Sequence, residues 1–147
     1  MKKIKKRIAL VAHDNMKKDL IEWAHYNKGT LEDFDIYSTG TTGGLLEKKL
    51  HMNITKLKSG ALGGDQQLGS MIANGDIDFL VFFWDPLSVQ PHDVDVKSLL
   101  RLSVLYNIPT ACNRATADFL ISSSLIGTSY EKAHPDHKTY LARKIEL

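Results

Sequence analysis

The sequence predicts one α/β domain whose mostly parallel five-stranded sheet is covered by helices on both faces. Five short apolar runs rich in β-branched and aromatic residues recur along the chain, and a segment with helical spacing follows each of them. Strands that alternate with helices are joined by right-handed crossovers, which makes the strands parallel. The 147 residues suffice for one full core and are too few for two comfortable domains, so we expect a single domain over 1–147.

The expected strands are read from continuous apolar runs. The first, RIALVAH at 7–13, shows no polar alternation and is expected to be buried on both faces. IDFLVFF at 77–83 is the most strongly apolar run of the chain. The full set of expected strands is 7–13, 34–39, 54–59, 77–83 and 109–113.

The expected helices occupy the segments between these strands. Asp14 or Asn15 can cap the first helix, whose apolar stripe consists of Leu20, Ile21 and Ala24. The remaining expected helices are 44–51, 65–74, 96–106 and 115–124, followed by a last helical piece in the tail KTYLARKIEL at 138–147.

Composition and charge exclude several classes of protein. No apolar run approaches the roughly 20 residues of a membrane-spanning helix, and the start MKKIKKRIALVAHD lacks the cleavage site of a signal peptide. The single Cys112 cannot form an internal disulfide, so we expect a cytoplasmic location. The net charge of +2 is too small to indicate nucleic-acid binding. The basic cluster near the start is interpreted as solvated charge flanking a strand; it consists of Lys2, Lys3, Lys5, Lys6 and Arg7.

Nearly every unusual polar residue of the chain follows the end of an expected strand. In parallel α/β folds, ligands bind beyond the carboxyl ends of the strands, which lie at one edge of the sheet. The polar residues concerned are, strand by strand, His13, Asp14 and Lys17; TGTTGG at 39–44; Ser59, Gly60 and Asp65; Asp85, His92, Asp93 and Asp95; and Asn113. This convergence predicts a functional site at that edge.

The stretch TGTTGG at 39–44 indicates a phosphate site. Its backbone N–H groups, threonine hydroxyls and helix dipole all favour a dianionic phosphate, and Lys17 and Ser59–Gly60 are expected nearby. It is neither the dinucleotide pattern GxGxxG nor the nucleotide loop GxxxxGK[ST], so a large nucleotide is not implied. The alternative is a turn that is rich in glycine for steric reasons, with Lys17 a solvated helix residue.

His13 and His92 are candidate hydrogen-bond donors. A neutral imidazole can donate to a carbonyl oxygen and stabilise the negative charge that develops there. The alternative is that each histidine is structural or simply exposed. No HxH or HxxxH pair and no thiolate cluster accompanies them, so we expect no metal site.

Asp65 stands in SGALGGDQQLG at 59–69, where two glycines can bring the backbone close to a ligand and place the carboxylate over it. Next to a polarised carbonyl, an ionised carboxylate is a candidate base for an α C–H proton. A pKa near the reference of roughly 4 would leave it ionised at neutral pH. The alternative, equally supported by local sequence, is that Asp65 caps the following helix. Asp85 is interpreted as structural, holding the turn WDP.

Taken together, the motifs resemble the methylglyoxal synthase family. They are VAHD, STGTTG, SGALGGDQQLG, FFWDPL, PHDVDVKSLLRL and NIPTACNRATADF, in this order over about 7–120. The resemblance implies a three-layer flavodoxin-like fold and an enzyme that converts dihydroxyacetone phosphate (glycerone phosphate) to methylglyoxal and inorganic phosphate, a glycolytic bypass. It also implies no metal or organic cofactor, a homohexamer, and inhibition by phosphate.

The resemblance also assigns residues. Asp65 matches the catalytic acid/base, Asp95 and Asp14 match acids near the pocket, and Asp95 is a second candidate for proton handling. Arg143 or Lys144 is available where some relatives carry an arginine that reaches a neighbouring subunit. The matched substrate-binding positions are His13, Lys17, Thr39, Gly40, Thr41, Thr42, Ser59, Gly60 and His92, the last at the carbonyl end of the substrate.

The mechanism expected from these residues is an elimination. The phosphate loop holds the dianion, Asp65 removes a C3 proton, His92 stabilises the enediolate, and phosphate leaves from C1. Two other functions stay open. The same fold serves as an effector-sensing regulatory domain in carbamoyl-phosphate synthetases, and a phosphotriose isomerase would use similar groups without releasing phosphate.

Overall fold

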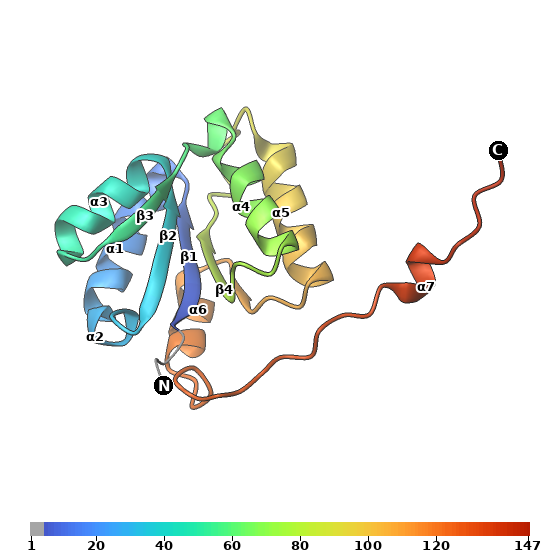
Figure 1. Ribbon diagram of the computed structural model, residues 1–147. Coiled ribbons are helices and arrows are strands. Elements are labelled where there is room, and N and C mark those ends of the chain that lie inside the picture. Colours follow the sequence, from blue (N-terminus) through green and yellow to red (C-terminus); the bar gives the residue numbers. More distant parts are fainter. Residues whose placement is uncertain (1–4) are drawn as a thin grey trace.

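The computed structural model describes residues 5–147 and has three layers, a central sheet with helices on both faces (Figure 1). The strands are β1 (Lys6–Ala12), β2 (Phe34–Thr39), β3 (Ile54–Leu57), β4 (Phe79–Phe83) and β5 (Thr110–Ala111). All neighbouring strands are parallel, in the order β3-β2-β1-β4-β5. The expected three-layer α/β fold with five strands is therefore confirmed. Of the basic cluster near the start, Lys2 and Lys3 lie outside the described residues.

The strand order places the topological switch point between β1 and β4. The chain moves outward from β1 through β2 to β3, then returns to the other side of β1 for β4 and β5. Flavodoxin itself has the order 2-1-3-4-5, so the layers correspond to that fold while the switch point lies elsewhere. Ligands bind where the strand order reverses, because the loops there diverge to opposite faces and leave a crevice.

The helices divide between the two faces of the sheet. One face carries α1 (Lys17–Tyr26), the short α2 (Lys28–Leu31), α3 (Gly40–Leu50) and α6 (Arg114–Ile121), and the other carries α4 (Gly64–Ala73) and α5 (Asp93–Leu105). Two 3-10 turns, η1 (Asp14–Met16) and η2 (Gly60–Leu62), follow β1 and β3, and a last short helix, α7 (Lys138–Leu141), lies in the tail. No helix among the described residues is both long enough and apolar enough to cross a bilayer.

Alternating residues of each strand build two hydrophobic cores. In β1, Ile8 and Leu10 contribute to the core beneath α1, α3 and α6, whereas Ala9 and Val11 contribute to the core beneath α4 and α5. This division confirms that the first strand is buried on both faces. Since side chains alternate across a sheet, a run without polar alternation is what two covered faces require.

Two helices begin at least three residues earlier than expected. The helix expected at 44–51 starts at Gly40, and the one expected at 96–106 starts at Asp93. Glycine and threonine lower helix propensity, so TGTTGG favoured a loop. Packing overrides that preference: a Cβ at Gly43 would lie 2.7 Å from Lys56 Cγ and 3.4 Å from Ser38 Cβ, so the absence of a side chain lets the helix pack closely against β2 and β3. The carboxylates in the first turn of α5 stabilise its amino terminus.

Several other elements are shorter than expected. The strands expected at 54–59, 77–83 and 109–113 shorten to 54–57, 79–83 and 110–111, and the expected helix 115–124 spans 114–121. Of the expected helical tail 138–147, only 138–141 is helical. The short α2 was not expected, because glycine and threonine make up half of it; the complete burial of Leu31 in the core holds it in place.

The expectation that Asp14 or Asn15 caps the first long helix was wrong. The N-cap of α1 is Met16, and no side chain caps it. Asp14 instead accepts a hydrogen bond from Lys17 Nζ, and the Asn15 amide donates to the Asp85 carboxylate. Both side chains thus serve contacts at the end of β1 rather than the helix terminus.

The carboxyl-terminal arm, residues 138–147, leaves the layered part of the protein (Figure 1). The preceding segment is attached: Lys6 Nζ donates to the carbonyl oxygen of Tyr130, and Lys132 Nζ donates to that of Tyr106. Beyond it, Leu141 and Ile145 are 75% and 69% exposed. These apolar side chains belong to neither hydrophobic core of the described residues.

Candidate active site

A cavity of about 300 Å³ lies beyond the carboxyl ends of β1, β2 and β3 and reaches the loop after β4. It brings together every catalytic and substrate-binding residue expected from the sequence except Asp95, namely His13, Lys17, Thr39, Gly40, Thr41, Thr42, Ser59, Gly60, Asp65 and His92. Asp14 also lines it. The remaining lining residues were not expected from the sequence and are Val11, Ala12, Ala61, Phe82, Gln90 and Pro91. All of them except Gln90 lie within the motifs that carry the family resemblance, but none is of a residue type that suggests a chemical role.

Asp65 and His92 face each other in this cavity. Asp65 Oδ2 lies 3.5 Å from His92 Nε2, and the aspartate is only 3% exposed. Asp65 stands in the first turn of α4, and Gly63, not Asp65, is the N-cap. The helix-cap alternative for Asp65 is therefore wrong. Neither Asp65 Oδ2 nor His92 Nδ1 has a hydrogen-bond partner among the described residues.

Burial raises the pKa of Asp65 above its ordinary value. His92 opposes this by attraction, and the negative charge of Asp95 adds to it. The expected pKa near the reference value thus needs correction, because the carboxylate is desolvated. A desolvated carboxylate is a stronger base than one in water. Asp95, in the first turn of α5, does not line the cavity and acts on Asp65 through its charge.

Two glycines near Asp65 stand where a side chain would not fit. A side chain at Gly60 would lie 2.8 Å from His92 Nε2 and 3.1 Å from both Asp65 oxygens, so it would occupy the space between them. At Gly64 a Cβ would lie 1.8 Å from the backbone oxygen of Lys58, which is far inside contact distance. Glycine at position 64 therefore allows the backbone of the turn after β3 to pack directly against the start of α4.

The amino terminus of α3 faces the same cavity. Its N-cap, Thr39, makes no side-chain capping bond, and the N–H of Gly40 donates to the Lys58 carbonyl oxygen. The N–H groups of Thr41 and Thr42 have no acceptor within the helix, because the first turn of any helix lacks them. Together with the partial positive charge of the helix end, these groups suit a phosphate dianion.

Lys17 supplies a positive charge at this end of the cavity. Its Nζ atom donates to the carbonyl oxygen of Ala12 at 3.4 Å and to the Asp14 carboxylate at 2.5 Å. The ammonium lowers the pKa of Asp14 through that hydrogen bond. Lys17 is therefore fixed at the cavity wall rather than a freely solvated helix lysine.

His13 lies between the β1 and β4 ends of the site. Its ring is edge-on to His92, with centroids 6.0 Å apart, and it is 5% exposed. Burial lowers its pKa, and the electrostatic interaction with His92 lowers it further. The neutral ring is thus the favoured form, which suits a hydrogen-bond donor and not a permanent cation.

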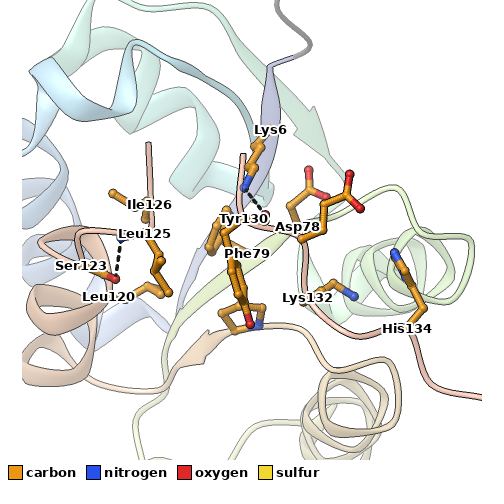
Figure 2. Close-up of a pocket in the computed structure, with 12 residues that line it drawn as sticks. Lys6, Asp78, Phe79, Leu120, Ser123, Leu125, Ile126, Tyr130, Lys132 and His134 are labelled. Carbon is orange, nitrogen blue, oxygen red and sulfur yellow. Dashed lines mark hydrogen bonds between the residues drawn. The ribbon is translucent and has the colours of Figure 1, made fainter. Parts of the chain in front are cut away.

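A second cavity, of about 320 Å³, lies at the opposite edge of the sheet and carries no comparable chemistry (Figure 2). It is mainly apolar, formed where residues 120–134 pass the amino ends of β1 and β4. Lys6 and Lys132 at its wall donate to backbone carbonyl oxygens, and Asp78 is paired with Arg7. Within residues 5–147, no three His, Cys, Asp or Glu side chains gather as a metal site would require.

Comparison with known proteins assigns the family. The model of the MGS-like domain matches residues 19–112. The methylglyoxal synthase of Coxiella burnetii is 52% identical over 140 residues, covering 95% of this chain and 98% of that protein, and that of Saccharophagus degradans is 51% identical, covering 95% and 91%. The crystal structure of methylglyoxal synthase from Elizabethkingia anophelis NUHP1 superimposes with a TM-score of 0.91 at 51% identity, covering 97% of this chain and 93% of that one. The chain therefore belongs to the methylglyoxal synthase family of lyases.

Proposed function

We propose that this protein converts dihydroxyacetone phosphate to methylglyoxal and inorganic phosphate. The observation that carries the proposal is the pairing of a buried carboxylate, Asp65, with an imidazole, His92, in a cavity that also contains the free amino terminus of α3. A base, a donor for a carbonyl oxygen and a phosphate site are the three parts the reaction needs. The names of the relatives at about 50% identity support the same reaction.

The first step is removal of a C3 proton. The amino terminus of α3, Ser59 and Lys17 hold the phosphate, which places the hydroxyl-bearing C3 near Asp65. The Asp65 carboxylate takes the proton while His92 donates a hydrogen bond to the C2 oxygen, where negative charge develops. The product of this step is an enediolate. Asp95, by keeping Asp65 basic, supports the proton transfer without contacting the substrate.

The second step is loss of phosphate from C1. The C1–O bond must stand roughly perpendicular to the enediolate plane, so that the π electrons can expel the leaving group. An isomerase would hold that bond in the plane and keep the phosphate attached. The orientation in which Thr39–Thr42, Ser59 and Lys17 bind the phosphate therefore decides between elimination and isomerisation. As phosphate leaves, the C3 oxygen gives up its proton and becomes the aldehyde oxygen. The released enol becomes methylglyoxal when C1 gains a proton and the C2 hydroxyl loses one.

Product analysis of the wild-type protein tests the proposed reaction. Incubation with dihydroxyacetone phosphate is expected to release methylglyoxal and inorganic phosphate in equal amounts, measured together over a time course. Glyceraldehyde phosphate without free phosphate would instead identify an isomerase. Binding of the triose phosphate without any turnover would identify a sensor domain.

The raised pKa of Asp65 predicts an acid limb in the activity profile. The base must be ionised, so kcat/KM falls as the pH falls through the pKa of Asp65, and burial places that fall above the reference of about 4. A ¹³C NMR titration of the Asp65 carboxyl in the free protein should give the same pKa without the substrate phosphate, which itself titrates near pH 6. Activity that stays on its plateau down to about pH 4 would contradict this expectation.

We further propose that the protein is a cytoplasmic homohexamer. The carboxyl-terminal arm supports assembly, because Tyr140, Leu141 and Ile145 are largely exposed on a segment with no core of its own. Within the arm, Arg143 stacks on the Tyr140 ring, its guanidinium 3.7 Å from the ring centroid. Apolar side chains presented in this way favour contact with a neighbouring copy.

Substitution in the arm tests the assembly. Leu141→Ser combined with Ile145→Ser is expected to lower the molar mass measured by light scattering after size exclusion, because it removes the apolar contact. The matched control, Lys138→Ser with Thr139→Ser, changes polar positions of the same arm and should leave the mass unchanged. A wild-type mass other than that of six chains would refute the hexamer.

Inorganic phosphate is proposed as an inhibitor as well as a product. The amino terminus of α3 would bind free phosphate through the same N–H groups that hold the substrate. Phosphate added to the assay should therefore raise the apparent KM for the triose phosphate. Whether the inhibition is cooperative depends on the assembly.

A further inference from the structure

The hydrogen bond to His13 defines which of its nitrogens carries the proton. The backbone N–H of Asp85 donates to His13 Nδ1 at 3.0 Å, and both groups are buried. A nitrogen that accepts a hydrogen bond carries no proton, so the neutral ring has its proton on Nε2. Nε2 is buried without a partner among the described residues, and His13 lines the cavity. The ring is thus a preformed donor.

The side chain of Asp85 is held from two sides. Its Oδ2 accepts from Asn15 Nδ2 at 2.9 Å, and its Oδ1 accepts from the backbone N–H of Leu87 at 3.0 Å. These hydrogen bonds lower the pKa of Asp85, so the carboxylate stays ionised and keeps accepting. Since both oxygens are engaged, the backbone of residue 85 and its N–H direction are held as well.

Asn15 connects the two sides of the topological switch point through its hydrogen bond to Asp85. It lies in η1, two residues after His13 at the end of β1, while Asp85 lies two residues after the end of β4. The His13 backbone N–H donates to the carbonyl oxygen of Phe83, which continues the pairing of the two strands. The Asn15–Asp85 hydrogen bond therefore joins the two strand ends just where the site opens.

We propose that Asn15 and the Asp85 carboxylate are positioning residues that hold the Asp85 N–H against His13 Nδ1 and so present His13 Nε2–H to the substrate. Identification of that substrate as a triose phosphate rests on the proposed function. The opposite tautomer would present a lone pair to an anionic ligand and repel it. The charged and titratable groups around His13 are Lys17, Asp85, His92 and Asp93. Among the described residues, none of these side chains donates to Nδ1; the backbone N–H of Asp85 does.

Reversal of the hydrogen bond between residues 15 and 85 tests the proposal. Asn15→Asp places a second carboxylate against Asp85, and repulsion should turn the Asp85 side chain away. Asp85→Asn added to Asn15→Asp restores a donor facing an acceptor, with the direction reversed, and still leaves an oxygen for the Leu87 N–H. Asn53→Asp is the matched control, since it makes the same charge change at an exposed asparagine outside the cavity. Asn15→Ala removes the donor without adding charge.

The measurements are the tautomer of His13, from long-range ¹H–¹⁵N NMR correlations, and kcat and KM for dihydroxyacetone phosphate. Wild type and Asn53→Asp should show a single Nε2–H tautomer. Asn15→Asp should show mixed tautomers and a loss of about tenfold in kcat/KM, Asn15→Ala a smaller change in the same direction, and the double variant the wild-type tautomer and rate.

Two results would overturn the positioning role: an unchanged His13 tautomer in Asn15→Asp, or a double variant that keeps the mixed tautomers of the single one. Failure of the proposed function is distinguishable, because it would leave the wild type without methylglyoxal formation. The NMR measurement needs no substrate and would still decide whether Asn15 and Asp85 position His13.

Discussion

Replacement of Asp65 by asparagine is expected to lower the rate of methylglyoxal formation by a factor on the order of 10³. Asparagine keeps the shape of the side chain but cannot accept the C3 proton. The loss should appear in kcat more than in KM, because the proposed mechanism assigns phosphate binding to the amino terminus of α3 and not to Asp65, although both line the cavity. The measurement is steady-state release of methylglyoxal and phosphate by Asp65→Asn, with Asp118→Asn as the matched control at an exposed position of α6.

The same variant should be at least as stable as the wild type. Burial raises the pKa of Asp65 in the folded state, so ionisation is harder in the folded protein than in the unfolded chain. The protonated carboxyl therefore contributes its full stabilisation at pH values below the pKa that Asp65 has in the unfolded chain. This stabilisation is lost as the pH rises through the higher pKa of the folded protein. At neutral pH the ionised carboxylate destabilises the fold, and asparagine removes that cost.

A wild-type rate of methylglyoxal formation in a folded Asp65→Asn protein would contradict the role of Asp65 as the base.

Replacement of Gly64 by alanine is expected to lower the free energy of unfolding by about 3 kcal/mol. The new Cβ would lie 1.8 Å from the Lys58 oxygen and 2.9 Å from the Ser59 carbonyl carbon, both of them backbone atoms. Neither can rotate away, so the turn after β3 or the start of α4 must shift. For a chain of this size the corresponding fall in Tm is about 10 °C, measured by thermal unfolding.

Gly44→Ala is the matched control for this change. Gly44 is also a helical glycine, in α3, but nothing lies within 4 Å of a Cβ built there. Alanine should therefore raise the free energy of unfolding by about 0.5–1 kcal/mol through its better helix propensity. Equal midpoints for Gly64→Ala and the wild type would show that the close approach of the backbone is not needed for the fold.

Much of the site could be predicted without coordinates, because the carboxyl ends of parallel strands meet at one edge. His13, Thr39 and Asp65 are distant in sequence but follow strands that the apolar runs already located. The topology alone places them together. The family motifs supplied the same residues independently, and the cavity contains all of them except Asp95. The residues that the sequence missed, such as Phe82 and Gln90, are ordinary in type and carry no chemical signal.

The sequence by itself determined the layers, the number of strands and the edge that carries the site, because these depend on periodicity and chain order, which are local properties. Only the tertiary structure decided whether Asp65 caps a helix or faces His92, how its pKa shifts and which nitrogen of His13 carries the proton. These properties depend on burial and on partners from other strands. The hydrogen bond from Asn15 to Asp85 spans 70 residues of the chain and exists only because β1 and β4 are neighbours in the sheet.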